Sequence, residues 1–224
     1  MKPAIVLLAA GSGSRFGHAT NKVWLPLSGK TVICRTISNA HIAFPNARLL
    51  LVISPDDEAM AREILDKEIP NIDIKFTYGG STRHGSEYQA LMHLKNDIQS
   101  GDIDVVLIHD GARPLATPDL YKKIAEVAVE KGGAIPTTTI NPVEIDFSHD
   151  TQIVRVQTPQ GFRAKELLTA YEKAEVDGFV GTDTGACVET YFPEIKAIAV
   201  EAEVSNLKIT FAHDLQLAEA LLTS

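Results

Sequence analysis

The distribution of apolar residues along the chain predicts alternating strands and helices. Short runs of consecutive apolar residues are typical of strands that are covered on both faces. We expect such strands at residues 4–8, 48–54, 72–77, 104–108, 134–140 and 195–200. Helical patterns fall between or after them, at residues 32–41, 84–98, 164–173, 183–191 and 213–222. The alternation predicts an α/β fold, in which a mostly parallel sheet is covered by helices on both faces.

Two further helices carry sequence signals for their first turn. Ser54 and Thr117 each precede a proline and an acidic residue, which is the preferred order of N-cap, first helical position and first-turn acid. We therefore expect one helix to begin directly after Ser54 and another directly after Thr117.

The segment 141–157 does not fit the alternation, because it has no helical period and is longer than most connections. Its apolar members Val143, Ile145 and Phe147 alternate with polar residues, as in a strand that pairs with another strand. It is either an arm or an ordinary surface loop. Since no internal repeat or linker-like stretch occurs, we expect residues 1–224 to form a single domain.

Composition narrows the class of protein. The chain has 224 residues, of which 45% are hydrophobic and 22% charged, as in an ordinary globular domain with a sizeable core. The net charge of −8 argues against a nucleic-acid partner, because nucleic-acid affinity comes largely from neutralising phosphates. No apolar run approaches the roughly 20 residues of a membrane span, so we expect no membrane partner.

Cys34 and Cys187 are too few and too far apart in the sequence for a disulfide framework or a zinc site. We expect both to be reduced thiols in a cytoplasmic protein. Lys2 and the apolar run after it are a poor match for a secretory signal, because the run is short and a glycine-containing loop follows at once.

That loop, residues 9–22, follows the first predicted strand and carries the strongest chemical pattern. Gly11 and Gly13 let the backbone approach a ligand closely, so that several N–H groups can point at one anion. A Rossmann dinucleotide fingerprint requires a third glycine, but Phe16 occupies that position. The loop therefore favours a phosphate group over an NAD-type dinucleotide.

Two cations, Arg15 and Lys22, accompany the loop. They suit a triphosphate, whose charge must be neutralised before its α-phosphorus can be attacked. The same pattern also fits a strand-to-helix turn with two solvated cations, and the loop alone leaves both interpretations open.

Polar motifs also follow other predicted strands. Residues 79–86 come after the strand at 72–77, and residues 110–113 come after the strand at 104–108. In an open α/β sheet, ligands bind beyond the carboxyl ends of the strands. We therefore expect these motifs and the glycine-containing loop to converge on one site.

Seven stretches together resemble the sugar-phosphate nucleotidyltransferases, and within them the cytidylyltransferases that make CDP-methylerythritol for non-mevalonate isoprenoid synthesis. The stretches are AAGSGSRFG (9–17), NKVWLPLSGKTV (21–32), GGSTRHGSEYQAL (79–91), IHDGARP (108–114), QTPQGF (157–162), TDTGA (182–186) and SNLKIT (205–210). The resemblance covers nearly the whole chain and implies a Rossmann-like three-layer sandwich of the nucleotide-diphospho-sugar transferase type, with a small β-arm. In the family, this arm builds a homodimer.

The implied reaction is attack of a phosphate oxygen of 2-C-methyl-D-erythritol 4-phosphate on the α-phosphorus of CTP, with release of pyrophosphate. A phosphate monoester is already anionic near pH 7, so the site needs positioning and charge compensation rather than a strong base. The resemblance accordingly assigns catalysis to Arg15, Lys22 and Lys208. For an isolated strand-terminal lysine such as Lys208, a solvated end is the usual alternative.

Small residues, backbone groups and a few side chains are expected to hold the nucleotide. They are Ala9, Ala10, Gly11, Ser12, Gly13, Gly80, Ser81, Arg83, Ser86, Asp110 and Gly111. The resemblance gives Asp110 a role with Mg²⁺ or another divalent cation, which commonly takes one or two carboxylates plus substrate phosphates. From the residues alone, Asp110 and Ser86 fit turn or helix caps equally well, and Arg83 fits scaffolding or phosphate binding.

Arg113, Thr158 and Thr182 match positions that hold the acceptor phosphate in the family, while Asp183 fits either a helix cap or substrate hydroxyls. On the arm, Val143 and Asp150 stand where relatives carry an acceptor-contacting threonine and arginine. Several relatives also carry an acid where this chain has Ser205, which weakens the case for a second carboxylate ligand.

These departures keep ribitol 5-phosphate or a related pentitol phosphate open as an alternative acceptor. A non-catalytic nucleotide-binding protein is disfavoured because all three expected catalytic cations are present. An NAD-type oxidoreductase is disfavoured because the third glycine of its fingerprint is missing.

Overall fold

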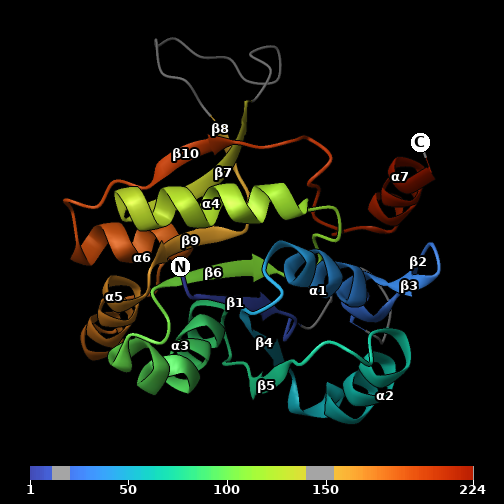
Figure 1. Cartoon of the computed structure of the whole chain (residues 1–224), viewed down its shortest axis with the longest axis horizontal. Helices are drawn as coiled ribbons and strands as arrows, with labels where there is room; N and C mark the ends of the chain where they lie inside the picture. The colour runs from blue at the N-terminus through green and yellow to red at the C-terminus, as the bar shows by residue number, and fades with distance from the viewer. Residues whose placement is uncertain (12–20, 140–153, 224) are drawn as a thin grey trace.

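The computed structural model describes residues 1–11, 21–139 and 154–223, which form a central sheet with helices on both sides (Figure 1). The strands lie in the order β10-β7-β9-β6-β1-β4-β5, and β8 pairs with β7 beside this row. Their bounds are β1 Pro3–Leu8, β4 Arg48–Ile53, β5 Lys75–Tyr78, β6 Val105–Asp110, β7 Gly133–Thr139, β8 Val154–Val156, β9 Gln160–Arg163 and β10 Ile198–Glu201.

Parallel pairing joins β5, β4, β1 and β6, and also β10 and β7. Only two of the strands described depart from this direction in the sheet: β9 is antiparallel to β6 and β7, and β8 is antiparallel to β7. The prediction of an α/β fold with a mostly parallel sheet is confirmed.

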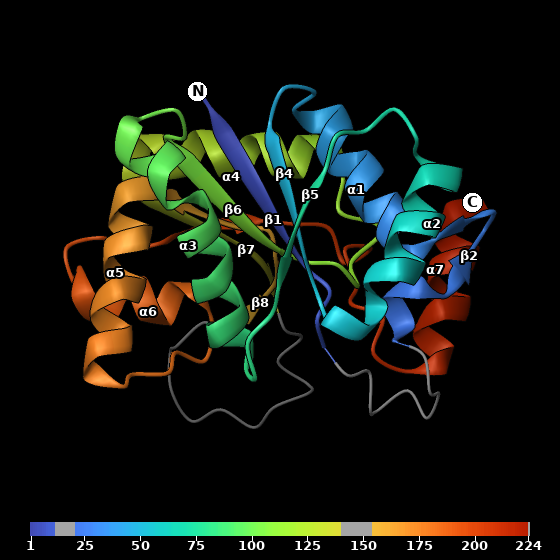
Figure 2. The same cartoon turned by 90° about the horizontal axis from the view of Figure 1, so that it is seen from below.

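The helices cover the two faces in separate groups (Figure 2). Along β1, Ile5 and Leu7 pack into a cluster with α1, α2 and α4, whereas Ala4 and Val6 pack with α3, α5 and α6. This division follows from the strand period of two, which sends successive side chains to opposite faces. The helix bounds are α1 Val32–Ala43, α2 Glu58–Glu68, α3 Arg83–Ser100, α4 Pro118–Lys131, α5 Ala164–Asp177, α6 Thr184–Tyr191 and α7 Ala212–Thr223.

The two helix-start predictions had different outcomes. The Thr117 hydroxyl accepts a hydrogen bond from the Leu120 amide at 3.3 Å, so α4 is capped as predicted. The prediction at Ser54 was wrong in detail. A 3₁₀ turn, η3 (Pro55–Asp57), comes first, the Ser54 side chain makes no capping hydrogen bond, and α2 begins only at Glu58.

Short elements without a clear apolar pattern were missed. β9 has four residues and includes Gly161, where a Cβ atom would lie 2.8 Å from Cγ2 of Ile124 on α4. The small hairpin of β2 (Pro26–Leu27) and β3 (Lys30–Thr31) turns at Ser28 and Gly29, both with positive φ. The expected turn there is present, and the two strands flanking it are additional.

Most of the segment 141–157 lies outside the described residues, including Val143 and Asp150. Its described end contains β8, which pairs with β7 of the same chain so that Val156 lies opposite Thr137. Cys34 and Cys187 are buried, free thiols, as expected, and burial raises the pKa of each to about 12. Among the helices described, none has the length and apolarity needed to cross a bilayer.

Candidate active site

A cavity of about 520 Å³ opens at the carboxyl ends of β1, β5 and β6. The motifs that follow these three strands meet here, as the strand order predicts. The lining residues are Leu8, Ala9, Ala10, Gly11, Asn21, Lys22, Val23, Gly80, Ser81, Thr82, Arg83, Ser86, Asp110, Ala112 and Lys208.

Asn21 positions the chain on either side of the glycine-containing loop. Its side-chain amide donates to the Ala9 carbonyl at 2.6 Å, and its side-chain oxygen accepts from the Val23 amide at 3.4 Å. It thereby caps η2 (Lys22–Trp24), the short 3₁₀ helix that begins at Lys22. Asn21 is not among the predicted site residues, although an asparagine before a short helix is a known capping signal.

The glycines at 79 and 80 allow the second loop to approach its neighbours closely. A Cβ atom at Gly79 would lie 2.5 Å from the Ala10 Cβ, and one at Gly80 would lie 2.8 Å from the Gly85 backbone carbon. The Ser86 hydroxyl accepts from the Gly80 amide at 3.1 Å and donates to the Thr82 carbonyl at 2.9 Å. Ser86 therefore holds the loop against the first turn of α3, where Thr82 is the N-cap.

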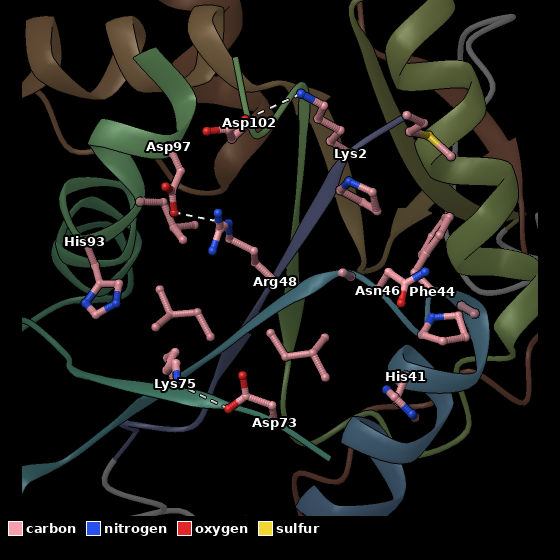
Figure 3. A pocket seen from close by; sticks show the side chains of 18 residues that line it. Lys2, His41, Phe44, Asn46, Arg48, Asp73, Lys75, His93, Asp97 and Asp102 are labelled. Atoms are coloured by element: carbon pink, nitrogen blue, oxygen red, sulfur yellow. Dashed lines mark hydrogen bonds and ion pairs between the residues drawn. The ribbon is translucent and has the colours of Figure 1, made fainter. Parts of the chain in front are cut away.

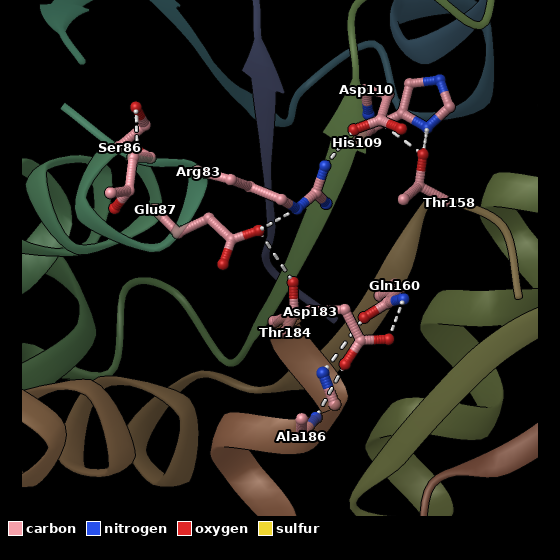
Figure 4. A network of polar contacts seen from close by, with 12 residues as sticks. Arg83, Ser86, Glu87, His109, Asp110, Thr158, Gln160, Asp183, Thr184 and Ala186 are labelled. Carbon is pink, nitrogen blue, oxygen red and sulfur yellow. Dashed lines mark hydrogen bonds and ion pairs between the residues drawn. The ribbon is translucent and has the colours of Figure 1, made fainter. Parts of the chain in front are cut away.

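Asp110 is the carboxylate on which the cations of the cavity converge, and Figure 4 shows it facing Arg83. It is buried at the end of β6 and pairs with Arg83, with Lys208 Nζ at 2.9 Å and with Arg113 Nε at 3.5 Å. Burial alone would raise the pKa of this carboxyl, but the three cations hold that pKa far below its usual range. Asp110 is therefore ionised, and it brings together the neighbouring Arg113 with Arg83 and Lys208 from distant parts of the chain.

Arg113 and Thr158 lie behind Asp110. Arg113 Nη1 donates to the Asn206 carbonyl at 2.7 Å, and burial lowers its pKa because Asp110 offsets the desolvation only in part. The Thr158 hydroxyl accepts from the Asp110 amide and contacts His109 Nδ1, each at 3.0 Å (Figure 4). Both side chains thus support the carboxylate in this conformation.

The Lys208 segment is fixed by its neighbours. The side-chain amide of Asn206 donates to the Gln157 side chain at 2.7 Å and to the Thr158 carbonyl at 3.0 Å. On the other side of Lys208, the Ile209 amide donates to the Ala112 carbonyl at 2.9 Å. These bonds aim Lys208 at Asp110, and sequence reasoning did not identify Asn206 as their source.

The acceptor-side residues are less closely gathered. Thr182 is exposed in the turn before α6. Asp183 is the N-cap of α6, since one carboxylate oxygen accepts from the Ala186 amide at 2.8 Å. Its other oxygen accepts from the Gln160 side chain at 3.1 Å. Between the two interpretations of Asp183, the structure therefore shows a helix cap.

Some predicted residues are not in the cavity wall. Gly111 does not line it; its amide donates to the Leu8 carbonyl at 2.9 Å, and a Cβ atom there would lie 2.8 Å from Cδ1 of Ile33. This glycine lets the chain after β6 pass close to α1 and to the end of β1. Ser12, Gly13 and Arg15 lie outside the described residues.

The described residues contain no cluster of three or more side chains that could hold a metal ion by themselves. Asp110 is the carboxylate in the cavity wall, and it could serve a divalent cation only together with ligand oxygens. This donor set suits Mg²⁺ bound to a polyphosphate and does not suit a resident protein-only metal site.

A larger cavity of about 890 Å³ opens at the opposite ends of the strands, where β1, β4 and β5 begin (Figure 3). Its charged side chains pair with one another across short distances. The pairs are Lys2 with Asp102 at 3.5 Å, Arg48 with Asp97 at 3.1 Å and Lys75 with Asp73 at 3.2 Å. The α-ammonium of Met1, which also lies in this wall, pairs with Asp104 at 3.9 Å, so each of these charges has a partner of opposite sign.

Comparison with known proteins points to one family. The model of the 2-C-methyl-D-erythritol 4-phosphate cytidylyltransferase family matches residues 4–224. A protein of that name from Geobacillus thermodenitrificans is 34% identical over 98% of this chain and 96% of its own length. Another from Bacillus cytotoxicus is 32% identical over 97% and 96%.

Solved structures agree. The 4-diphosphocytidyl-2C-methyl-D-erythritol synthase from Anaerococcus prevotii superposes with a TM-score of 0.81 at 27% identity, covering 100% of this chain and 96% of that one. The 2-C-methyl-D-erythritol 4-phosphate cytidylyltransferase from Thermus thermophilus gives 0.73 at 26% identity, covering 98% of each. The chain therefore belongs to the 2-C-methyl-D-erythritol 4-phosphate cytidylyltransferase family, a family of nucleotidyl-transferring enzymes.

Proposed function

We propose that this protein transfers the cytidylyl group of CTP to 2-C-methyl-D-erythritol 4-phosphate and releases pyrophosphate. Family membership over nearly the whole chain supports the reaction. The observation that carries the assignment of the site is the meeting of Lys22, Arg83 and Lys208 with the buried carboxylate of Asp110 in one cavity. Three cations and one carboxylate leave a positive field that suits a polyphosphate.

In this proposal, the triphosphate lies along the glycine-containing loop. Arg15 and Lys22 compensate charge on the phosphates, and Lys208 lies between the triphosphate and the acceptor phosphate. The acceptor phosphate attacks the α-phosphorus in line, and pyrophosphate leaves. Because the nucleophile is already anionic, preorganised cations supply the main catalytic effect.

Ala9, Ala10, Gly80, Ser81 and Ser86 would frame the cytosine. Their small side chains leave room for a pyrimidine, and backbone groups can recognise its amino group and carbonyl. The Ser86 hydroxyl accepts a hydrogen bond from the Gly80 amide, which supports a role for Ser86 in shaping this slot. Gly11, Ser12 and Gly13 would contribute backbone N–H groups to the phosphates.

Asp110 would hold Mg²⁺, or another divalent cation, together with oxygens of the triphosphate. The bound cation would neutralise charge on the phosphates. Arg113, Thr158 and Thr182 would hold the acceptor phosphate, Thr182 from the turn before α6. Arg113 and Thr158 also contact Asp110 from behind.

Pyrophosphate release in the presence of CTP and Mg²⁺ tests the function. We expect turnover with 2-C-methyl-D-erythritol 4-phosphate, and a pyrimidine slot predicts failure of ATP and GTP. UTP is the sharpest competitor, because it differs from CTP at the exocyclic group. Equal kcat/KM for CTP and UTP would contradict the cytosine slot, and preference for ribitol 5-phosphate would move the acceptor to the pentitol class.

We further propose that the chain forms a homodimer through residues 141–157. In the described part of this segment, β8 pairs antiparallel with the last three residues of β7, and Val156 is 51% exposed there. A two-fold contact of equivalent segments would cover it. Sedimentation should show dimers for the full chain and monomers after deletion of residues 143–152; dimers that survive the deletion would contradict the proposal.

A further inference from the structure

A buried carboxylate next to the cavity belongs to none of the groups assigned above. Glu87 lies on α3, one turn after Arg83, and its side chain is 1% exposed. Its Oε1 lies 3.0 Å from Arg83 Nε and accepts a hydrogen bond from the Thr184 hydroxyl at 3.1 Å (Figure 4). Its Oε2 accepts one from the Tyr171 hydroxyl. One cation and two hydroxyl donors, from three helices, therefore converge on one side chain.

A buried carboxylate is costly unless it is paired, so this arrangement needs an explanation. Burial raises the pKa of Glu87, and Arg83 and the two hydroxyls oppose that rise. Arg83 Nε and Glu87 form an ion pair without hydrogen-bond alignment, so the contact depends on the charge of the carboxylate. Glutamine has the same shape, but it loses the ion pair and turns one of the two hydrogen-bond acceptors into an amide donor.

Arg83 stands between two acids. Its Nε faces Glu87, its Nη1 faces Asp110, and its side chain lines the cavity at 32% exposure (Figure 4). A guanidinium anchored at two edges has one orientation, whereas a guanidinium held by Asp110 alone could pivot about that contact. Glu87 thus limits where Arg83 can point, although Glu87 itself does not line the cavity.

Glu87 also contacts the acceptor side of the site. Thr184 is the first residue of α6, directly after Thr182 and the cap Asp183. Tyr171 belongs to α5, which packs beside α6. One carboxylate therefore connects the helix that follows the nucleotide loop to the helix that follows the acceptor turn.

We propose that Glu87 is a positioning residue for nucleotidyl transfer, which fixes Arg83 against Asp110 and ties α3 to the start of α6. This inference rests on the proposed function. It predicts that the charge of Glu87 matters for the chemical step because it acts through Arg83, and that the hydroxyl on its far side matters much less.

The test compares Glu87→Gln with Tyr171→Phe. Glu87→Gln keeps the shape and removes the ion pair, and we expect kcat to fall about tenfold, within the range for residues coupled in one ion-pair network. KM for CTP should change less than kcat. Tyr171→Phe is the matched control: it removes the bond to Oε2 and leaves the Arg83 pair, so kcat should stay within about threefold.

A double-mutant cycle separates positioning from a general role in folding. In an Arg83→Gln background, adding Glu87→Gln should lower kcat little further, because the partner through which Glu87 acts is already gone. An equal drop in both backgrounds would overturn the inference, as would an unchanged kcat in Glu87→Gln alone.

Two controls keep the outcome decisive. If Glu87→Gln does not fold, Glu87→Asp replaces it: the charge remains but moves away from Arg83 by one methylene, so kcat should still fall, and an unchanged kcat would refute positioning. Wild-type turnover is measured first. An inactive wild type would contradict the proposed function, whereas an active wild type with an insensitive Glu87 would contradict only this inference.

Discussion

The sheet has a cavity at each end of its parallel strands: one at the amino end, where the strands begin, and one at the carboxyl end, where they stop. The two cavities have similar side chains but differ in how the charges pair. At the amino end, three cationic side chains and three carboxylates line the cavity and pair one to one. At the carboxyl end, the described cavity wall contains three cationic side chains and the single carboxylate of Asp110. Both cavities are large enough for a ligand, but only in the second do the charged side chains of the described wall carry an excess of one sign.

Burial strengthens this difference. The Lys75 and Asp73 side chains are 69% and 84% exposed, so their pair gains little from Coulomb attraction in water. The Asp110 side chain is 6% exposed, and it orders cations from α3, from the segment after β6 and from the segment before α7. A cavity volume therefore says little about function until the charges of its wall are counted and their burial is known.

The largest effect that we expect is a loss of kcat, and one substitution at each end of the strands tests the contrast between the two cavities. Lys208→Ala removes a cation that would compensate charge during transfer, and it should lower kcat by about 10²–10³, the scale for one preorganised electrostatic donor. Folding should persist, because Asp110 keeps Arg83 and Arg113. The measurement is steady-state pyrophosphate release with both substrates saturating, alongside thermal unfolding.

Lys75→Ala is the matched control at the amino end. It breaks an exposed pair that contributes about 0–1 kcal/mol to stability, so kcat should not change. A large loss of kcat in Lys75→Ala, or normal turnover in Lys208→Ala, would break the comparison between the two ends.

Much of this contrast could be predicted from the sequence. The apolar runs at residues 4–8 and 104–108 predicted two strands of a mostly parallel sheet. The structure shows that these strands are parallel neighbours, so the motifs after them meet at the carboxyl ends of the strands. Lys22, Arg83, Asp110 and Lys208 therefore line one cavity, although they come from four separate parts of the chain.

Other features could not be predicted, because their cause lies in contacts between distant residues. Glu87 follows an ordinary helical pattern, and nothing local indicates that Tyr171 and Thr184 donate to it. β9 is only four residues long and has a glycine where α4 packs closely, so its apolar pattern is too short to identify a strand. Asn206 likewise gains its role only through Gln157 and Thr158.

A smaller effect should appear in stability, and it also separates the two ends. His109 is buried beside Asp110, between the Thr158 hydroxyl and the Arg113 carbonyl. Burial lowers its pKa to about 3, so the imidazole is neutral in the folded protein at moderately acidic pH. At the amino end, His93 lines the other cavity and is exposed, which makes it the matched comparison.

The sign of the effect follows from proton binding. Below about pH 6.5 the unfolded chain binds a proton on His109, but the folded protein does not until about pH 3, so the free energy of unfolding falls as the pH is lowered through this window. The slope from His109 should reach about 1.4 kcal/mol per pH unit.

Urea unfolding between pH 7.5 and 5 measures this slope above the pH range where most carboxylates titrate. His109→Gln, whose amide keeps one donor and one acceptor, should lower the slope, and what remains includes the contribution of His84, whose pKa burial also lowers. The substitution His93→Gln, at an exposed position, should change the slope much less. If the free energy of unfolding had the same pH slope in the wild type and in His109→Gln, then His109 would not be held neutral by burial.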